Sequence, residues 1–430
     1  MKKFNKSLVA CGVALALTAP ITAMATNGYF AHGYGMKSKG MGGAGVAYAQ
    51  DAMAAATNPA GITEVNDRVD FGVDMFMPDR TATVYGVERD GNETASFFIP
   101  EFGYSSKIND KSAWAVVVYG NGGMNTDYKT GIYSTSSAAG AANDQTPTGI
   151  NLEQLFIAPT YAMKVNDANS IGVSLNLVYQ TFSANGLSNF IGFKENNATG
   201  TAGLTDQGTD SSTGMGLKLG WTSEVNDALT VGLTYQSETK MSKFSKYDNL
   251  FANDGEFNIP SSIAIGLAYK ATPKMNVALD VQQINYSSIP AIANKNCGFT
   301  VAHPGTCDLG DAEGAGFGWK DVTAVKLGVD YQTSDKLVLR AGLNQGSNPI
   351  SDTETAFNVL APGVVESHYT LGATYTLQND SEITLAYMHA PKVEVEGSSQ
   401  ALTTAGMNNA GHGDIAMSQT SFGIGYGWKF

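Results

Sequence analysis

The chain has 430 residues, of which 43% are hydrophobic and only 15% are charged, and its formal net charge is −13. This acidic balance argues against a nucleic-acid partner, which would need basic patches, and against a pore selective for phosphate. The length suits two or three soluble domains or one large barrel.

Residues 1–25 have the pattern of a secretory signal peptide. Three lysines precede a short apolar run at residues 8–17, and an Ala-Met-Ala cleavage site ends at Ala25. We therefore expect an exported protein whose mature chain begins at Thr26 and has a net charge of about −16 without those lysines. No later run approaches the roughly 18 consecutive apolar residues of a membrane helix.

Residues 26–64 do not alternate between apolar and polar side chains, and they are too few to fold alone. An Ala-rich run at 47–56 predicts short helices that end before Pro59, because the residue before a proline is rarely helical. The glycines of this segment permit close approach and unusual backbone angles. They are Gly40, Gly42, Gly43 and Gly45, and no Gly-Lys-Ser/Thr ending makes them a phosphate loop. We expect the segment to fold inside a barrel as a plug, or hatch.

Residues 65–430 alternate apolar and small polar residues over many short segments. In the segment 229–236 the odd positions are Leu, Val, Leu and Tyr, whereas the even positions are Thr, Gly, Thr and Gln. A period of two residues predicts a strand with one apolar face. The pattern recurs at 171–179, 263–269, 325–331, 337–341, 371–375 and 383–387.

The connections between these segments are alternately short and long. The short ones carry Asn-Asp, Thr-Pro or Ser-Asp pairs, which suit tight turns. They lie at 109–110, 166–167, 226–227, 272–273, 334–335 and 379–380. The long ones lie near 121–150, 182–212, 240–258, 289–320, 346–366 and 392–417. All short turns then lie at one end of an up-and-down sheet, which must close if it crosses a membrane, since its backbone groups have to bond internally.

We therefore predict an all-β fold, an antiparallel transmembrane β-barrel of about 14 strands in the bacterial outer membrane. The last strand supports this prediction, because apolar and aromatic residues alternate to the end of the chain. It resembles the terminal signal that the outer-membrane insertion machinery reads, and that machinery, membrane lipid and lipopolysaccharide are the expected partners. Its outward residues are Phe422, Ile424, Tyr426, Trp428 and Phe430.

Two sequence features resemble the long-chain fatty acid outer-membrane transporters, the FadL family. They are Asn58-Pro59-Ala60, with the Gly/Ala stretch before it, and YGNGGMNTDY at 119–128. The resemblance covers essentially the whole mature chain. It implies a monomeric barrel of about fourteen strands closed by a hatch, capture of hydrophobic ligands by outer loops, an inner pocket, and lateral release where the third strand kinks.

Carried onto this chain, the resemblance implies that Asn58, Pro59 and Ala60 lie in the hatch. It also implies that the glycines after the strand 114–119 lie at or near the kink, and glycine in a strand favours bends. These are Gly120, Gly122 and Gly123. The alternative is that they begin an outer loop.

Two long connections carry large apolar side chains, which are unusual in loops exposed to water. Such residues either pack together or bind something, and we expect an outer groove for an acyl chain or hydrocarbon, with packing over the barrel mouth as the alternative. The spacing in 240–258 also predicts one short helix. The candidates are Phe244, Tyr247, Leu250 and Phe251 in that connection, and Phe190 and Phe193 in 183–212.

Strand parity places Lys218, Lys326 and Arg340 on the lumen face, together with Asp280 and Asp330. A carboxylate in a poorly hydrated pocket needs a cation, and Arg340 is the first candidate because a guanidinium holds a carboxylate bidentately. The alternative is that these cations pair with the two aspartates. We expect uptake of long-chain fatty acids, with aromatic hydrocarbons or a general porin as alternatives.

Cys297 and Cys307 most simply form a disulfide that closes a loop. The alternative is a metal site, which would need ligands beyond these cysteines and His303 between them. We expect no metal and no cofactor, although calcium at the acidic outer loops stays open. An outer-membrane lipase would need a serine and a histidine side by side. The nearest approach is Ser367-His368, and adjacent strand residues point to opposite faces, so we do not expect an enzyme.

Overall fold

The computed structural model describes residues 27–84, 86–133, 147–194, 200–296, 307–398 and 413–430. The predicted signal peptide and Cys297 lie outside these ranges. No helix in the described ranges is long and apolar enough to cross a membrane.

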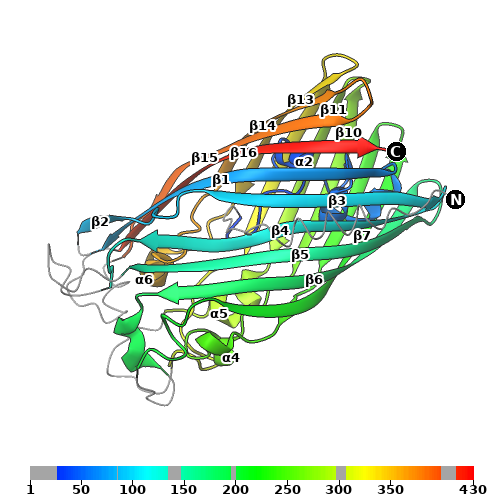
Figure 1. Cartoon of the computed structure of the whole chain (residues 1–430). Helices are drawn as coiled ribbons and strands as arrows, with labels where there is room; N and C mark the ends of the chain where they lie inside the picture. The colour runs from blue at the N-terminus through cyan, green and yellow to red at the C-terminus, as the bar shows by residue number, and fades with distance from the viewer. Residues whose placement is uncertain (1–26, 85, 134–146, 195–199, 297–306, 399–412) are drawn as a thin grey trace.

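One antiparallel sheet closes on itself to form a barrel (Figure 1). It has sixteen strands, of which β2 (Val87–Asp90) and β9 (Lys240–Met241) are short additions, so fourteen strands form the wall. The first and last strands pair from Arg68–Lys429 to Thr83–Asp414 and close the ring. The predicted barrel is therefore confirmed. The wall strands are β1 (Arg68–Val84), β3 (Phe97–Asn109), β4 (Ser112–Tyr128), β5 (Thr148–Lys164), β6 (Asn169–Asn185), β7 (Asp210–Asn226), β8 (Leu229–Gln236), β10 (Ser262–Thr272), β11 (Met275–Ile284), β12 (Val322–Gln332), β13 (Leu337–Gly346), β14 (Ser367–Thr376), β15 (Glu382–Val395) and β16 (Asp414–Lys429).

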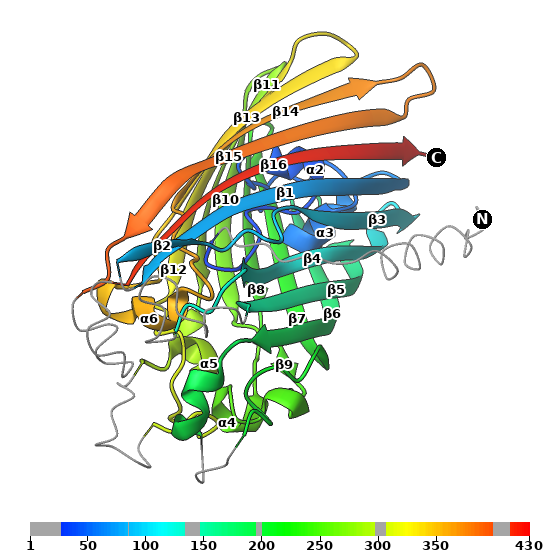
Figure 2. The ribbon, with the colours of Figure 1, turned by 60° about the vertical axis from the view of Figure 1, so that its left-hand side comes forward.

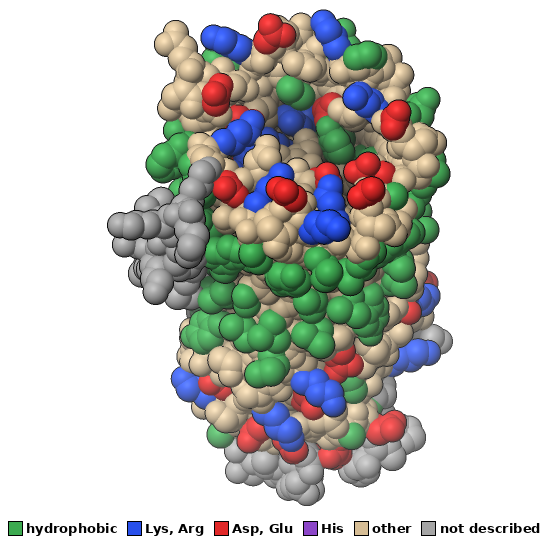
Figure 3. Space-filling model, turned by 90° about the vertical axis from the view of Figure 1, so that its right-hand side faces the viewer, with side chains coloured by type: hydrophobic (Ala, Val, Ile, Leu, Met, Phe, Trp, Pro, Cys, Tyr) green, Lys and Arg blue, Asp and Glu red, His purple; other side chains and the backbone are tan. Residues whose placement is uncertain are grey.

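The two faces of the wall differ as the alternation predicts. On β7, Leu217 and Leu219 are 49% and 51% exposed, whereas Lys218 between them is 6% exposed. Figure 3 shows the outward side chains as a broad hydrophobic area across the wall, with charged side chains gathered toward both ends. This apolar exterior is the surface that a bilayer requires of a barrel.

The two ends of the barrel have different connections (Figures 1 and 2). At one end, the short-turn end, the strands join through tight turns such as the one after β14, where Asp380 has a φ of 62°. Aspartate tolerates this left-handed backbone. At the other end, the long-loop end, the connections are longer, and they contain β2, β9 and several short helices. Those helices are η3 (Ser188–Phe193), η5 (Ser245–Tyr247), α4 (Ala252–Gly255), η6 (Tyr286–Ser288), α5 (Pro290–Ala293), η7 (Asp352–Glu354) and α6 (Thr355–Asn358).

The chain before β1 lies inside the ring of strands (Figure 2). This part, residues 27–67, is called the hatch segment below, and it contains α2 (Met36–Lys39), α3 (Ala54–Thr57) and η1 (Pro59–Thr63). Of the Ala-rich run at 47–56 that was predicted to be helical, only the end is helical, since α3 begins at Ala54. Asn58 is extended, with φ −141° and ψ 111°, as expected of a residue before proline.

The wall presents glycine where the hatch segment touches it. A Cβ atom on Gly220 would lie 2.0 Å from Asn58 Oδ1, and one on Gly342 would lie 2.1 Å from the backbone nitrogen of Gly42. The hatch segment therefore fits only because these wall positions lack side chains. The wall glycines that make such contacts are called the glycine belt, and they are Gly103, Gly122, Gly172, Gly220, Gly232, Gly266, Gly328, Gly342, Gly346, Gly372, Gly423 and Gly425.

The single helix predicted within 240–258 is wrong. The connection forms one 3-10 turn, η5, and the one-turn helix α4, in which Asn253 and Asp254 have left-handed φ angles of 56° and 54°. Left-handed residues cannot continue an α-helix, so the apolar side chains here gather by packing and not by helical periodicity.

Candidate functional site

Wall carboxylates hold the hatch segment in place. Asp280 Oδ2 accepts bonds from the backbone nitrogens of Gly45 and Val46 at 2.7 and 3.0 Å, and Asp330 Oδ2 accepts from the hydroxyl of Tyr48 at 2.5 Å. Two further acids pair with buried hatch lysines, since Lys37 bonds Glu382 at 2.7 Å and Lys39 bonds Asp74 at 2.8 Å. Glu101 and Asp70 accept from the backbone nitrogens of Gly35 and Ala52. These six wall carboxylates therefore bond groups of the hatch segment.

The hatch residues named from the sequence make further contacts. Gly42 and Gly43 have positive φ angles of 68° and 81°, and a Cβ on Gly43 would lie 1.7 Å from the His32 carbonyl oxygen. Gly40 lies against Gly372, and Gly45 donates to Asp280 as described. Pro59 and Ala60 lie against Gly172 of the wall. The left-handed backbone at Gly42 and Gly43 and the close contact at each of them require glycine at these two positions.

Lys218 is buried, and no carboxylate in the described part of the chain lies within 4.0 Å of its ammonium group. Its ammonium group donates to the carbonyl oxygen of Ala56 in α3. It also lies 5.7 Å from the ring centre of Tyr34 and 6.0 Å from that of Tyr119. Aromatic faces attract a cation but do not neutralise its charge.

Lys326 is likewise 7% exposed, and Asp280 is its cross-strand neighbour. Among the described residues, no ion pair within 4.0 Å joins Lys218, Lys326 or Arg340 to a carboxylate. Arg340 instead donates to the side chains of Gln50 and Thr374 at 3.0 and 2.7 Å. Arg340 is thus engaged with the hatch segment, whereas neither lysine has a carboxylate of the described residues within 4.0 Å.

The two lysines border one narrow cavity between the hatch segment and strands β7 to β12. Its lining combines aromatic, amide and charged side chains, among them Phe30, Tyr34, Lys218, Gln236, Asp280 and Lys326. Burial raises the pKa of the Tyr34 phenol, and its hydroxyl donates to Asn121 Oδ1 at 2.9 Å. We call this space the lumen cavity; sequence patterns identified its lysines but not Tyr34 or Gln236.

Strands β3 and β4 separate at the level of this cavity. They pair only from Asn109–Ser112 to Phe102–Val118, although β4 continues to Tyr128. The register of β4 against β5 shifts between Gly120 and Gly122. We call the gap between residues 97–101 and 119–124 the window.

The hatch segment replaces β3 as the partner of β4 in the window. The backbone of Ala31 donates to the Asn121 carbonyl at 2.9 Å, and Gly123 donates to the Tyr29 carbonyl at 3.1 Å. A Cβ on Gly122 would lie 1.9 Å from that Tyr29 oxygen, so close approach requires glycine there. The strand predicted to end at Tyr119 therefore continues, and the three glycines do not begin an outer loop; they lie within β4 at its bulge.

A second cavity lies in the outer loops at the long-loop end. Phe190, Leu250 and Phe251 line it, whereas Phe244 and Tyr247 are fully buried beside it against Phe182. Phe193 packs at the margin of the same core. Large apolar lining residues also come from connections that sequence reasoning did not link to the groove. They are Leu309, Phe317, Phe357 and Leu360.

Cys307 is disulfide-bonded, and the other half of the predicted pair lies outside the described residues. In the described ranges, no three His, Cys, Asp or Glu side chains gather where they could hold a metal ion. Ser367 donates to Gln345 and is partly exposed, whereas His368 is fully buried on the lumen side.

A family model described as outer membrane protein transport protein (OMPP1/FadL/TodX) matches residues 13–430. The chain belongs to this family. It is therefore an outer-membrane transporter of hydrophobic compounds. Among its relatives, the long-chain fatty acid transport protein of Escherichia coli K12 is 23% identical over 446 residues, covering 91% of this chain and 93% of the relative. Outer membrane protein P1 of Haemophilus influenzae is 22% identical, covering 96% and 98%.

Solved structures share the fold. The Pseudomonas putida toluene transporter TodX has a TM-score of 0.66 at 19% identity, covering 93% of this chain and 99% of TodX. A Pseudomonas aeruginosa FadL homologue has a TM-score of 0.65 at 16% identity, covering 96% and 100%. At these identities the likeness extends to the barrel and leaves the substrate open.

Proposed function

We propose that this transporter takes up hydrophobic carboxylic acids, with long-chain fatty acids as the natural class. The observation that carries the proposal is the pair of buried lysines in the lumen cavity. Lys218 and Lys326 are 6% and 7% exposed, and no carboxylate of the described residues lies within ion-pair distance of either. The carboxylate of a ligand would supply the missing partner.

The energetics favour an acid over a neutral hydrocarbon. Burying an ammonium group costs several kcal/mol unless an opposite charge and hydrogen bonds compensate. A pocket built only for toluene-like ligands would gain nothing from two such groups. The name of the Escherichia coli relative agrees with an acid ligand, and the toluene transporters, which share the fold, define the alternative.

The path we propose begins at the outer-loop cavity and ends at the window. The outer cavity offers an apolar site for an acyl chain through Phe190, Leu250 and Phe251. The lumen cavity then holds the carboxylate, and the window lies beside it because Tyr34 contacts both Lys218 and Asn121. Lateral release needs the hatch residues 29–31 to leave β4. We further expect a monomer surrounded by lipid and lipopolysaccharide, placed by the insertion machinery.

The test is uptake of labelled oleate by cells that lack their own long-chain transporter. We expect Lys218→Met and Lys326→Met to lower oleate uptake by at least about tenfold together, because a charge-assisted hydrogen bond contributes roughly 1.5–3 kcal/mol. Lys270→Met, at an exposed position of β10, is the control and leaves uptake unchanged.

Uptake of labelled toluene by the same cells distinguishes the two substrate classes. If the double variant takes up oleate normally while surface expression is equal, the acid proposal fails. Toluene uptake by the wild type without oleate uptake would assign the hydrocarbon class instead.

A further inference from the structure

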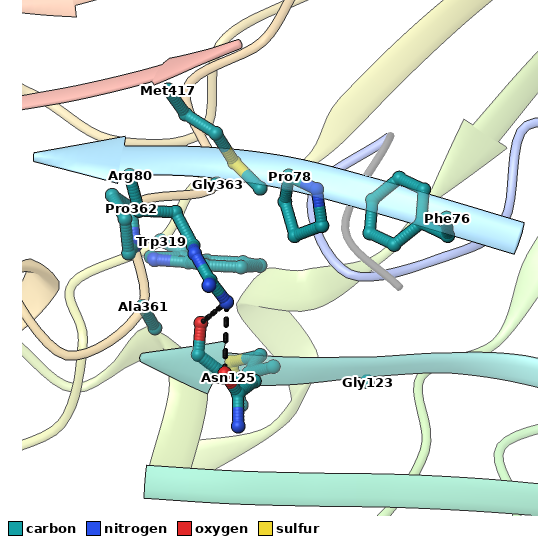
Figure 4. Close-up of a pocket in the computed structure, with 11 residues that line it drawn as sticks. Phe76, Pro78, Arg80, Gly123, Asn125, Trp319, Ala361, Pro362, Gly363 and Met417 are labelled. Atoms are coloured by element: carbon teal, nitrogen blue, oxygen red, sulfur yellow. Dashed lines mark hydrogen bonds between the residues drawn. The ribbon is translucent and has the colours of Figure 1, made fainter. Parts of the chain in front are cut away.

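We propose that Arg80 is a latch that holds the long-loop end of the window closed. The inference rests on the proposed lateral release and adds a positioning residue that neither the sequence motifs nor the comparisons assign. Arg80 lies on β1 and is 1% exposed, yet its guanidinium reaches β4, two strands away in the sheet (Figure 4).

The window has a different boundary at each end. Toward the short-turn end it stops where Phe102 and Val118 pair. Toward the long-loop end, β3 has not yet begun, and the segment between β2 and β3 bonds the edge of β4. The backbone of Asp127 donates to the Gly91 carbonyl at 3.0 Å, and Glu93 donates to the Asp127 carbonyl at 3.1 Å. The Thr94 hydroxyl also donates to Asp127 Oδ2 at 2.7 Å. These bonds replace a strand ladder on this edge of β4, while its other edge pairs with β5.

Arg80 lies beneath these bonds and joins the same elements. Its Nη1 donates to the carbonyl and side-chain oxygens of Asn125 at 2.9 and 2.8 Å. Its Nη2 donates to the Thr94 carbonyl at 2.7 Å, and its Nε donates to Asn92 Oδ1 at 3.0 Å. One side chain, through its planar guanidinium group, thus connects β1, the segment before β3, and β4.

The chemistry of the site favours a latch over a second site for an acid ligand. All four acceptors are neutral oxygens, so four of the five guanidinium N–H groups are used within the protein. Asn92 also donates to Asp79 and Asp90 at 2.8 and 2.6 Å, which places negative charge behind the guanidinium. A small cavity lined by Arg80, Asn125 and Trp319 lies beside the guanidinium (Figure 4), and that charge would repel a carboxylate that approached it.

Asn125 extends the connection along the wall. Its side-chain nitrogen donates to Asn151 Oδ1 of β5 at 3.0 Å. The long-loop end of β4 is therefore held from β1 and from β5, and only the first of these connections crosses the window. Loss of the Arg80 fork would leave the β4–β5 pairing intact, and the opposite edge would be held only by the bonds between Asp127 and residues 91–94.

The experiment measures access to the window from the bilayer. Ile99 is 3% exposed, and its Cγ2 lies 3.1 Å from the Cβ position of Gly120 across the window. In proteoliposomes, Ile99→Cys is labelled with a lipid-soluble maleimide. We expect Arg80→Met to raise the labelling rate by at least about tenfold and Asn125→Ala to raise it less, because the backbone acceptor remains. The double variant should match Arg80→Met.

Two controls separate a latch from general loosening of the barrel. Lys270→Met removes a cation from an exposed position of β10, on another part of the wall, and it should leave labelling unchanged. Ala324→Cys reports a fully buried position on β12, and its labelling should stay slow in every variant. Arg80→Lys keeps the charge but not the fork and should rescue only part of the closure.

An unchanged Ile99→Cys labelling rate in folded Arg80→Met protein overturns the latch, as does an equal rise at Ala324→Cys. If Arg80→Met does not assemble, Asn125→Ala and Arg80→Lys decide the matter by the same criteria. Labelling needs no substrate, so it reports on the latch even if oleate uptake proves independent of the lumen lysines.

Discussion

Asn58 Nδ2 donates to the main-chain carbonyl oxygen of Trp221 at 3.1 Å, and this bond joins the hatch segment to β7 of the wall. The same amide group donates to the Val46 carbonyl at 2.7 Å, while Asn58 Oδ1 accepts from the backbone of Ala60 at 3.1 Å. One side chain therefore fixes two turns of the hatch segment to each other and to the barrel.

We predict that Asn58→Asp loosens the hatch segment while the barrel still forms. The aspartate loses both donors and brings a negative charge next to two carbonyl oxygens, which costs at least about 3 kcal/mol. Hydrogen–deuterium exchange of residues 44–63 should rise in the variant. Asn109→Asp, at a tight turn where either residue accepts the same backbone bond, is the control. Unchanged exchange at 44–63 would show that this side chain is not needed for docking.

The glycine belt predicts a steric defect at a position far from any loop. In Gly342→Ala the new methyl group would lie 2.1 Å from the Gly42 nitrogen, so backbone must shift. Overpacking of this kind typically costs about 1–3 kcal/mol, and the temperature of heat-induced unfolding in detergent should fall. Gly192→Ala meets nothing within 4 Å and should behave as wild type. Equal unfolding temperatures for the two variants would contradict the contact.

The pair Lys39–Asp74 predicts a cost that depends on which partner is removed. The two groups lie 2.8 Å apart, and their side chains are 5% and 1% exposed. Lys39→Met alone leaves a buried carboxylate and should destabilise the protein by about 3–5 kcal/mol, whereas Lys39→Met with Asp74→Leu should be close to neutral. Equilibrium unfolding of both variants makes the comparison. A double variant as unstable as the single one would refute this reading.

If ligands leave through the window, a disulfide bond across it should stop their release. Ile99→Cys and Gly120→Cys place two sulfurs within disulfide reach. We expect the oxidised pair to lose substrate uptake and the reduced pair to recover it. Each single cysteine and the reductant-treated wild type are needed as controls, since Cys307 is itself disulfide-bonded. Full uptake by the oxidised pair would mean that ligands leave by another route.

Much of the wall follows from local sequence. A period of two residues is enough to assign strands, and it also places Lys218 and Lys326 on the lumen side, where the structure has both buried. Off-face glycines such as Gly220 and Gly342 were visible in the pattern too. Their purpose was not, because a strand sequence carries no information about what lies against its inner face.

The contacts of the lumen depend on residues that are distant in sequence. Arg340 bonds Gln50, which is 290 positions away, so no local pattern distinguishes it from the unpaired lysines. The end of β4 was missed for a related reason. Three glycines and an asparagine are poor strand formers, and β4 persists there because the hatch segment and β5 supply its hydrogen bonds.

The position of the hatch segment at the start of the chain also constrains how the protein is made. Lys37 can bond Glu382 only after a further 345 residues have been synthesised, and Gly42 can bond Thr370 only after a further 328. Contacts of such separation form late, because the intervening chain must be ordered first. The earliest-synthesised part of the mature protein is thus among the last to reach its final place. A barrel that lacks β15 would leave Lys37 without Glu382, and one that lacks β11 would leave the Gly45 and Val46 amides without Asp280, so docking of the hatch segment reports that these late strands are in place.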